Sequence, residues 1–547
     1  MKRSKKTKRV VILLCLCLVL CLLAGCGKKK SSGRFIDLID GKKTESGNNW
    51  PWSTTESLST EQPPTEEYTS EEPPTEELTT GEPPTEQPPT QPGRIENSVY
   101  VMIYNPLQYD EYDYDTESKT SLNTGSIGDQ IKAGSNRADG TGTDHPFMIS
   151  QREWELPEIK KKPNNRSGGL NPVYSKGDNK EFYIYGDDMT ATGRHKQSFK
   201  CVYDGTHCYV WDMDGSLTEK QAKAFGEEFD SFIFEKDEKA FGKGRFTENG
   251  GKVNILFQPM ASPGLLGFFT PLDIFATEEM DPQYVDMYGF NLDHAIININ
   301  SLYASDTKTI NATLAHEYQH LICMTSTVET NCNRDNIRTW LNESMSAYAE
   351  ELVYPGTKGE RDYDLEFYYS KNYSRGQSLF NFSHEGDETI GDYGVVYLFE
   401  EYLTESAGED VFTKVHSNWR SSSDFTPDEA QLIYNSVPSK VQNDITSRWV
   451  YPASVSGKMT SNYQEWMSKL TLDFYLYCLR QDKVQNSSLA HDSMVYPEIN
   501  PCNIEGGGRI IVELKNGSFD IPDDADSGLV YIGLDRDYNP VTGIVTK

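Results

Sequence analysis

The chain has 547 residues, of which 36% are hydrophobic and 25% are charged, and its formal net charge at pH 7 is −31. Such an excess of acidic residues argues against nucleic acid as a partner, because phosphate backbones attract basic surfaces. The length allows two or three domains with a large hydrophobic core.

Residues 1–25 have the order of a secretory signal peptide. Six lysines and arginines precede an apolar run at 10–23, which is shorter than a bilayer-spanning helix requires. The run ends in Leu-Ala-Gly-Cys at 23–26, which resembles a bacterial lipobox and so implies cleavage before Cys26 and lipid attachment to its thiol. We therefore expect a protein anchored in the cell membrane and facing outside the cytoplasm. An uncleaved signal anchor is the alternative.

Residues 26–96 are predicted to form the lipid anchor and a stalk. The segment 61–92 repeats Pro-Pro-Thr-Glu and has almost no apolar residues. Paired prolines favour extended polyproline II and the glutamates repel one another, so the segment should hold the folded part away from the membrane. Protein recognition by the prolines is the alternative.

The rest of the chain predicts an α+β fold in three parts. Short, alternating, aromatic-rich runs indicate a strand-rich N-terminal region at 97–217. The part at 218–495 begins with a helical pattern at 218–234 and is mainly helical from 308 onward. A small C-terminal β region follows at 496–547, and strands first with helices later favour α+β. Further strands are predicted at 252–257, 294–300, 509–514 and 528–533.

Cys201 and Cys208 flank Asp204-Gly205 symmetrically. A two-residue turn there would set the two cysteines opposite each other on neighbouring antiparallel strands, close enough for a disulfide bond. Zinc binding by these thiols is the rival interpretation, which the lack of any C-x-x-C pair in the sequence disfavours.

A metal-binding pattern lies within the helical segment 309–324, where His-Glu-Tyr-Gln-His occupies 316–320. A spacing of four residues places two helical side chains on one face. One helical turn is the separation that lets both imidazoles reach a single ion. The pattern predicts Zn²⁺ on His316 and His320, with Glu317 as the general base that takes a proton from water.

A second helical segment at 339–350 supplies Glu343 as the predicted third ligand. Two nitrogens and one oxygen leave a fourth coordination position for water. A solvated surface carboxylate is the alternative for Glu343, and large apolar neighbours on the same helix disfavour it. These neighbours are Trp340, Leu341, Met345 and Tyr348.

These motifs resemble those of the gluzincin metallopeptidases, and most specifically the hyicolysin family. The resemblance spans about 200–425 and is carried by Thr-Leu-Ala-His-Glu-Tyr-Gln-His-Leu-Ile at 313–322, Trp-Leu-Asn-Glu at 340–343 and Tyr-Gly-Val-Val-Tyr-Leu-Phe at 393–399. It implies a zincin-type fold with zinc on the two histidines and the glutamate. The Gly-x-Met-Glu-Asn motif by which zinc aminopeptidases hold the substrate amine is absent from the sequence, which favours an endopeptidase.

Two features depart from the thermolysin type. The gap between His320 and Glu343 is 22 residues, longer than usual, and Ala347 stands where thermolysin-type enzymes carry an aspartate that supports a ligand. We expect Glu350, one turn further along the helix, to take that supporting role.

Similarity to an aminopeptidase tyrosine indicates Tyr393 as the donor that stabilises the developing oxyanion. A core position for Tyr393 is the alternative, and His384 is a rival donor. The strand at 294–300 is expected along the cleft, where an extended substrate could add to its edge. Its alternating pattern fits an interior strand equally well.

The sequence therefore predicts an extracellular, lipid-anchored zinc metalloendopeptidase that acts on proteins or peptides and contacts the membrane through the lipid on Cys26. The competing class is a cell-surface binding module or an inactive peptidase homologue. The three predicted zinc ligands and the predicted general base are all present in the sequence, which favours the enzyme. Calcium would be a further cofactor, but no residue pattern supports it.

Overall fold

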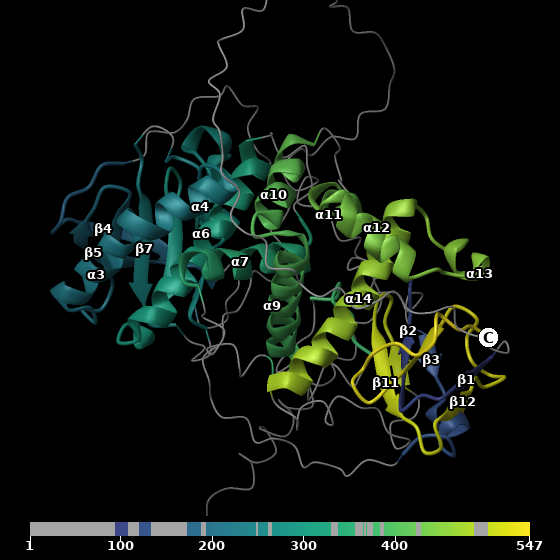
Figure 1. Ribbon diagram of the computed structural model, residues 1–547. Coiled ribbons are helices and arrows are strands. Elements are labelled where there is room, and N and C mark those ends of the chain that lie inside the picture. Colours follow the sequence, from purple (N-terminus) through teal and green to yellow (C-terminus); the bar gives the residue numbers. More distant parts are fainter. Residues whose placement is uncertain are drawn as a thin grey trace, which may run out of the picture.

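The computed structural model describes most of the chain beyond residue 92 (Figure 1). Cys26, the proline-rich segment 61–92 and His384 lie outside the described residues. Within the described ranges, none of the helices combines the length and the hydrophobicity that a membrane span requires. The described residues are 93–107, 120–132, 172–186, 193–247, 250–260, 265–329, 337–355, 365, 368, 376–382, 388–422, 428–485 and 502–547.

A six-stranded sheet forms one lobe of the molecule. Three central strands run parallel, and the remaining three pair antiparallel with their neighbours. In spatial order the strands are β4 (Asn179–Ile184), β5 (His195–Asp204), β6 (Cys208–Asp212), β7 (Val253–Gln258), β9 (Ala295–Asn300) and β8 (Gly267–Phe268).

Strand β9 lies in the interior of this sheet. It pairs with β7 on one side and with β8 on the other, and every residue of β7 and β9 is buried. The expectation that a substrate could add to the edge of the strand at 294–300 is therefore wrong, and the alternative of an interior strand is the one observed. Among the described strands, β8 occupies this edge of the sheet.

The predicted helix at 218–234 is present but changes its winding partway. Helix α3 (Glu219–Glu228) starts with a capping box between Thr218 and Gln221 and continues through a π-helical turn at Phe229–Ile233 into α4 (Phe234–Phe241). Asp230 in the π-helical turn accepts the backbone N–H groups of Thr206 and His207, each at 2.7 Å. The turn thus fastens the helix to the β5–β6 connection.

Helices α6 (Thr307–Glu329) and α7 (Thr339–Val353) follow β9 and lead into a helical lobe (Figure 1). Trp340 of α7 packs edge-on against Phe380 and Phe399, with ring centroids 5.1 and 5.6 Å apart. The lobe continues through α9 (Glu388–Ala407), α10 (Val411–Ser421), α11 (Glu429–Ser436), α12 (Ser439–Arg448), α13 (Ala453–Ser456) and α14 (Asn462–Gln485).

The predicted N-terminal strand region divides between two parts of the fold. Strand β2 (Tyr100–Tyr104) lies between β11 (Arg509–Glu513) and β13 (Val530–Leu534), whereas β4 to β6 belong to the six-stranded sheet. The C-terminal β region is thus completed by N-terminal strands. Two more such pairs are β1 (Arg94–Glu96) with β12 (Ser518–Asp520), and β3 (Thr120–Leu122) with β10 (Cys502–Ile504).

The strand register overturns the predicted pairing of Cys201 with Cys208. Cys201 lies opposite Trp211, and Asp204 pairs with Tyr209, so four residues rather than two connect the paired positions. A bulge between Cys201 and Tyr203 shifts the register further. The two cysteines are buried in different hydrophobic clusters and both are free thiols.

We predict that Cys201 and Cys208 stay reduced in the folded protein, because each sulfur packs into a separate cluster. Alkylation after unfolding without a reductant should label both residues in a mass-spectrometric digest. A sample reduced before alkylation provides the reference for complete labelling. A disulfide-linked 201–208 peptide in the unreduced digest would contradict the prediction.

Candidate metal centre

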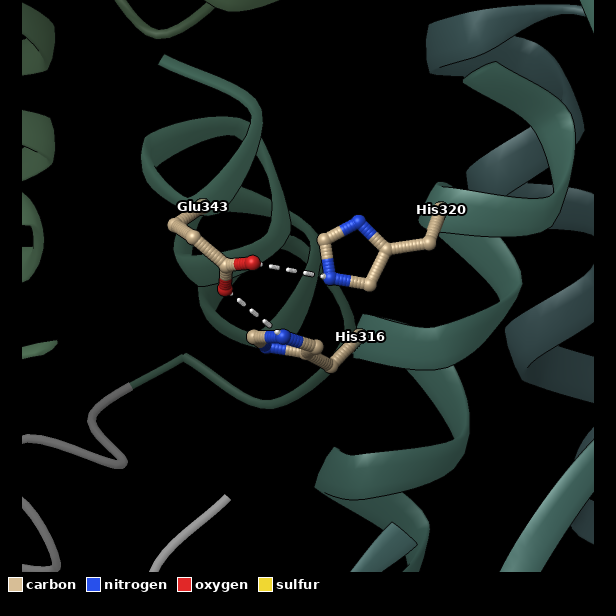
Figure 2. A group of neighbouring side chains, drawn as sticks. All are labelled: His316, His320 and Glu343. Atoms are coloured by element: carbon tan, nitrogen blue, oxygen red, sulfur yellow. Dashed lines mark ion pairs between the residues drawn. The ribbon is translucent and has the colours of Figure 1, made fainter. Parts of the chain in front are cut away.

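Helices α6 and α7 bring three metal-binding side chains together (Figure 2). His316 and His320 project from α6 toward Glu343 on α7, and each residue is about 1% exposed. Glu343 places one oxygen 3.2 Å from Nε2 of His316 and the other 3.4 Å from Nε2 of His320. The possible ligand atoms of all three residues lie within 4.8 Å of one another.

The donor atoms of this group fit a zinc ion. Among the described residues, neither Glu343 oxygen nor Nε2 of His316 has a hydrogen-bond partner, although the ion-pair contacts are short. Buried polar atoms without hydrogen bonds cost roughly 1–3 kcal/mol each, so a bound cation would relieve this cost. Two imidazole nitrogens and one carboxylate oxygen match the zinc preference and leave a fourth position open.

The electrostatics of the group favour positive charge between the two helices. Burial opposes protonation of His316, but the carboxylates of Glu343 and Glu350 outweigh burial and raise the pKa of His316 to about 10. Burial likewise favours the neutral form of Glu343, yet His320 and His316 outweigh it and lower the pKa of Glu343 to about 2. The centre therefore holds an anionic carboxylate that attracts a cation.

Glu350 fixes the orientation of the first histidine ring. Its Oε1 lies 2.7 Å from Nδ1 of His316. Because a carboxylate can only accept, Nδ1 carries a proton and donates it to Glu350, so the neutral imidazole would offer Nε2 to a metal ion. This contact is the one expected for the supporting role that the sequence suggested for Glu350.

Ser346 of α7 lies against His320, and the residues predicted from the sequence did not include it. The Ser346 hydroxyl donates to Oε1 of Gln319 at 2.6 Å and lies 3.2 Å from Nδ1 and 3.4 Å from Nε2 of His320. A signal was present, because residues 343, 346 and 350 are spaced to share one face of a helix. Ligand and supporting groups on α7 thus form a single stripe.

Glu317 lies beside the histidines and contacts the residue that follows the edge strand β8. It is 1% exposed, and among the described residues its Oε1 has no hydrogen-bond partner. Burial raises the pKa of Glu317, while the two histidines and a hydrogen bond from the backbone N–H of Phe269 act in the opposite direction. Phe269 directly follows β8, a link that no sequence motif indicated.

Tyr393 is placed in the packing of α9. It is 3% exposed, and its ring meets that of Phe382 edge-on with centroids 5.1 Å apart. A position in the core was the alternative interpretation of this residue. Its role as an oxyanion donor stays a prediction, and the rival His384 lies outside the described residues.

We predict that Glu350→Gln weakens zinc binding by about 10–100-fold, the usual effect of losing a group that orients a ligand histidine. The amide keeps the side-chain volume but can no longer hold the Nδ1 proton through a charged contact. Zinc transfer to a competing chelator measures the change. Glu351→Gln, the same substitution one residue along, is the matched control, and equal affinities for the two variants would refute the prediction.

Comparison with known proteins gives one relative among curated proteins and several structures. No family model matches the chain. Over 243 residues the chain is 30% identical to the neutral metalloprotease ShpI of Staphylococcus hyicus, and the match covers 42% of this chain and 52% of that protein. The chain thus spans about half the length of this relative.

Two solved structures share low sequence identity with the chain. An M1 zinc metallopeptidase from Deinococcus radiodurans is 12% identical, with 50% of this chain and 53% of that chain covered, at a TM-score of 0.27. The catalytic module of the metalloprotease ZmpA from Clostridium perfringens is 9% identical, with 83% and 93% covered, also at 0.27. The resemblance to hyicolysin-type zinc metallopeptidases that the motifs indicate is confirmed by the similarity to ShpI.

Proposed function

We propose that the chain is a zinc metalloendopeptidase that hydrolyses internal peptide bonds of proteins or peptides outside the cell. The observation that carries the proposal is the convergence of His316, His320 and Glu343 around one buried point, with Glu317 directly after His316 in α6. The similarity to a neutral metalloprotease supports the same reaction class.

Each residue has a defined part in this reaction. His316, His320 and Glu343 would hold the zinc, which when bound polarises the scissile carbonyl and acidifies water. Glu317 accepts a proton from the attacking water as the new C–O bond forms. It returns the proton to the leaving nitrogen as the C–N bond breaks, so the amine departs neutral.

The edge strand β8 supports an extended substrate and hence internal cleavage. An edge strand can add a peptide through main-chain hydrogen bonds. Phe269, next to this strand, donates its N–H to Glu317, so a peptide along β8 would pass close to the general base. Gly267 has no room for a larger residue, since a Cβ there would lie 2.8 Å from the Asn298 carbonyl oxygen and from Thr313.

We further propose that the protein is a lipoprotein anchored through Cys26, with residues 26–96 as its stalk. The support is the order of charges, apolar run and lipobox-like tetrapeptide in the sequence. This arrangement would tether the catalytic lobe to the cell, with the stalk holding it away from the membrane among extracellular substrates.

The two glutamates should respond differently to substitution. Glu317→Gln keeps the side-chain volume and removes the base, so zinc content should stay near wild type while hydrolysis of casein falls by about 10²–10⁴-fold. Glu343→Ala removes a ligand oxygen, so zinc and activity should be lost together. Metal analysis and casein hydrolysis on the same preparations give both values.

The wild-type protein before and after chelation is the control for this pair. Suppose that wild type cleaves nothing, and that both variants keep zinc and bind a partner protein as well as wild type does. The peptidase proposal then fails, and the binding-module alternative replaces it.

Replacement of Cys26 tests the anchor. Cys26→Ala should move the protein, as uncleaved precursor or soluble chain, out of the detergent-dependent membrane fraction, because a single acylated thiol provides the proposed attachment. Cys21→Ala, within the apolar run of the signal, is the matched control and should remain in the membrane. Unchanged detergent-dependent retention of the Cys26 variant would refute the anchor.

A further inference from the structure

A cavity of about 510 Å³ opens in the helical lobe, between α11, α12 and the first turns of α14. Its volume falls in the range of about 300–1,000 Å³ that is usual for small-molecule sites. None of its lining residues belongs to the metal centre on α6 and α7. The lining residues are Tyr434, Thr446, Ser461, Asn462, Tyr463, Glu465, Trp466 and Lys469.

Three aromatic side chains form a corner in this cavity. The ring of Tyr434 lies 5.3 Å from that of Tyr463 and 5.1 Å from that of Trp466, at interplanar angles of 66° and 89°. The Trp466 indole N–H donates to the carbonyl oxygen of Gln442 at 3.3 Å, which fixes the indole plane. Tyr434 and Tyr463 are only partly buried, and both line the cavity.

The charged groups of the cavity neutralise each other. Nζ of Lys469 lies 2.7 Å from Oε1 of Glu465, and the Lys469 side chain is only 8% exposed. A cationic ligand would meet the ammonium group and an anionic ligand the carboxylate, so neither gains net attraction. The pair nevertheless offers hydrogen-bond donors and acceptors side by side, and Asn462 adds an amide with both.

We propose that this cavity binds a neutral sugar unit of an oligosaccharide or polysaccharide. A pyranose ring has an apolar face of C–H groups, which suits the rings of Tyr434 and Tyr463. Its neighbouring hydroxyls both donate and accept, which suits Glu465, Lys469 and Asn462. The site is separate from peptide hydrolysis and would tether the protein to a glycan surface.

Titration of the purified full chain with neutral trisaccharides tests this proposal. The probes are triacetylchitotriose, cellotriose and maltotriose, followed by calorimetry and by saturation-transfer NMR. At least one should bind, and Tyr463→Ala should weaken that binding by about tenfold. De-N-acetylated chitotriose, which is cationic, and trigalacturonic acid, which is anionic, should bind more weakly than the best neutral probe.

Matched variants separate a local effect from a loss of folding. Tyr284→Ala removes another partly buried tyrosine, which stacks on Tyr288 in helix α5 (Pro282–Tyr288), and should leave sugar binding unchanged. Asn462→Ala at an exposed position should weaken binding without affecting thermal stability. Casein hydrolysis by the Tyr463 variant should equal that of wild type.

Three results would overturn the proposal. The first is that no neutral trisaccharide binds, and the second is that the Tyr463 and Asn462 variants bind as tightly as wild type. The third is that a charged trisaccharide, or a peptide, binds in this cavity more tightly than the neutral probes.

Discussion

The structure around the metal centre depends on one buried contact, the approach of the Glu343 carboxylate to His316 and His320. A carboxylate buried without positive charge nearby is strongly destabilising. The Glu343 carboxylate can therefore be buried stably only where α7 faces the two imidazoles of α6. The aromatic packing around Trp340 holds α7 in that place. Glu350 then orients the ring of His316, and all three candidate zinc ligands lie on this helix pair.

Much of this centre could be predicted from the sequence because its information is local. One helical turn separates His316 from His320, and two helical turns separate Glu343 from Glu350, so each pair shares one face of its helix. The strands at 252–257 and 294–300 were found for a similar reason, since compact apolar runs coincide with β7 and β9. Where a feature lies within one helix or one strand, the periodicity of its residues is enough to predict it.

The incorrect predictions concern which strands and residues pair with each other, and local sequence patterns do not encode this pairing. Alternation at 294–300 is the same for an edge and an interior strand, and only the placement of β8 decides between them. The bulge beside Cys201 leaves no mark in composition, yet it changes which residues face each other. The hydrogen bond from Phe269 to Glu317 joins residues 48 positions apart through tertiary packing alone.

The placement of β2 between β11 and β13 has a consequence for biosynthesis. Ile103 pairs with Ile510 on one side and with Tyr531 on the other, so both partners are made at the far end of the chain. Non-local pairing of this kind is slow, and β2 has to wait until translation or export delivers the last strands. Until then the apolar side chains of β2 are not packed against β11 and β13. A chain truncated before β11 is therefore expected to aggregate through this unpaired N-terminal strand.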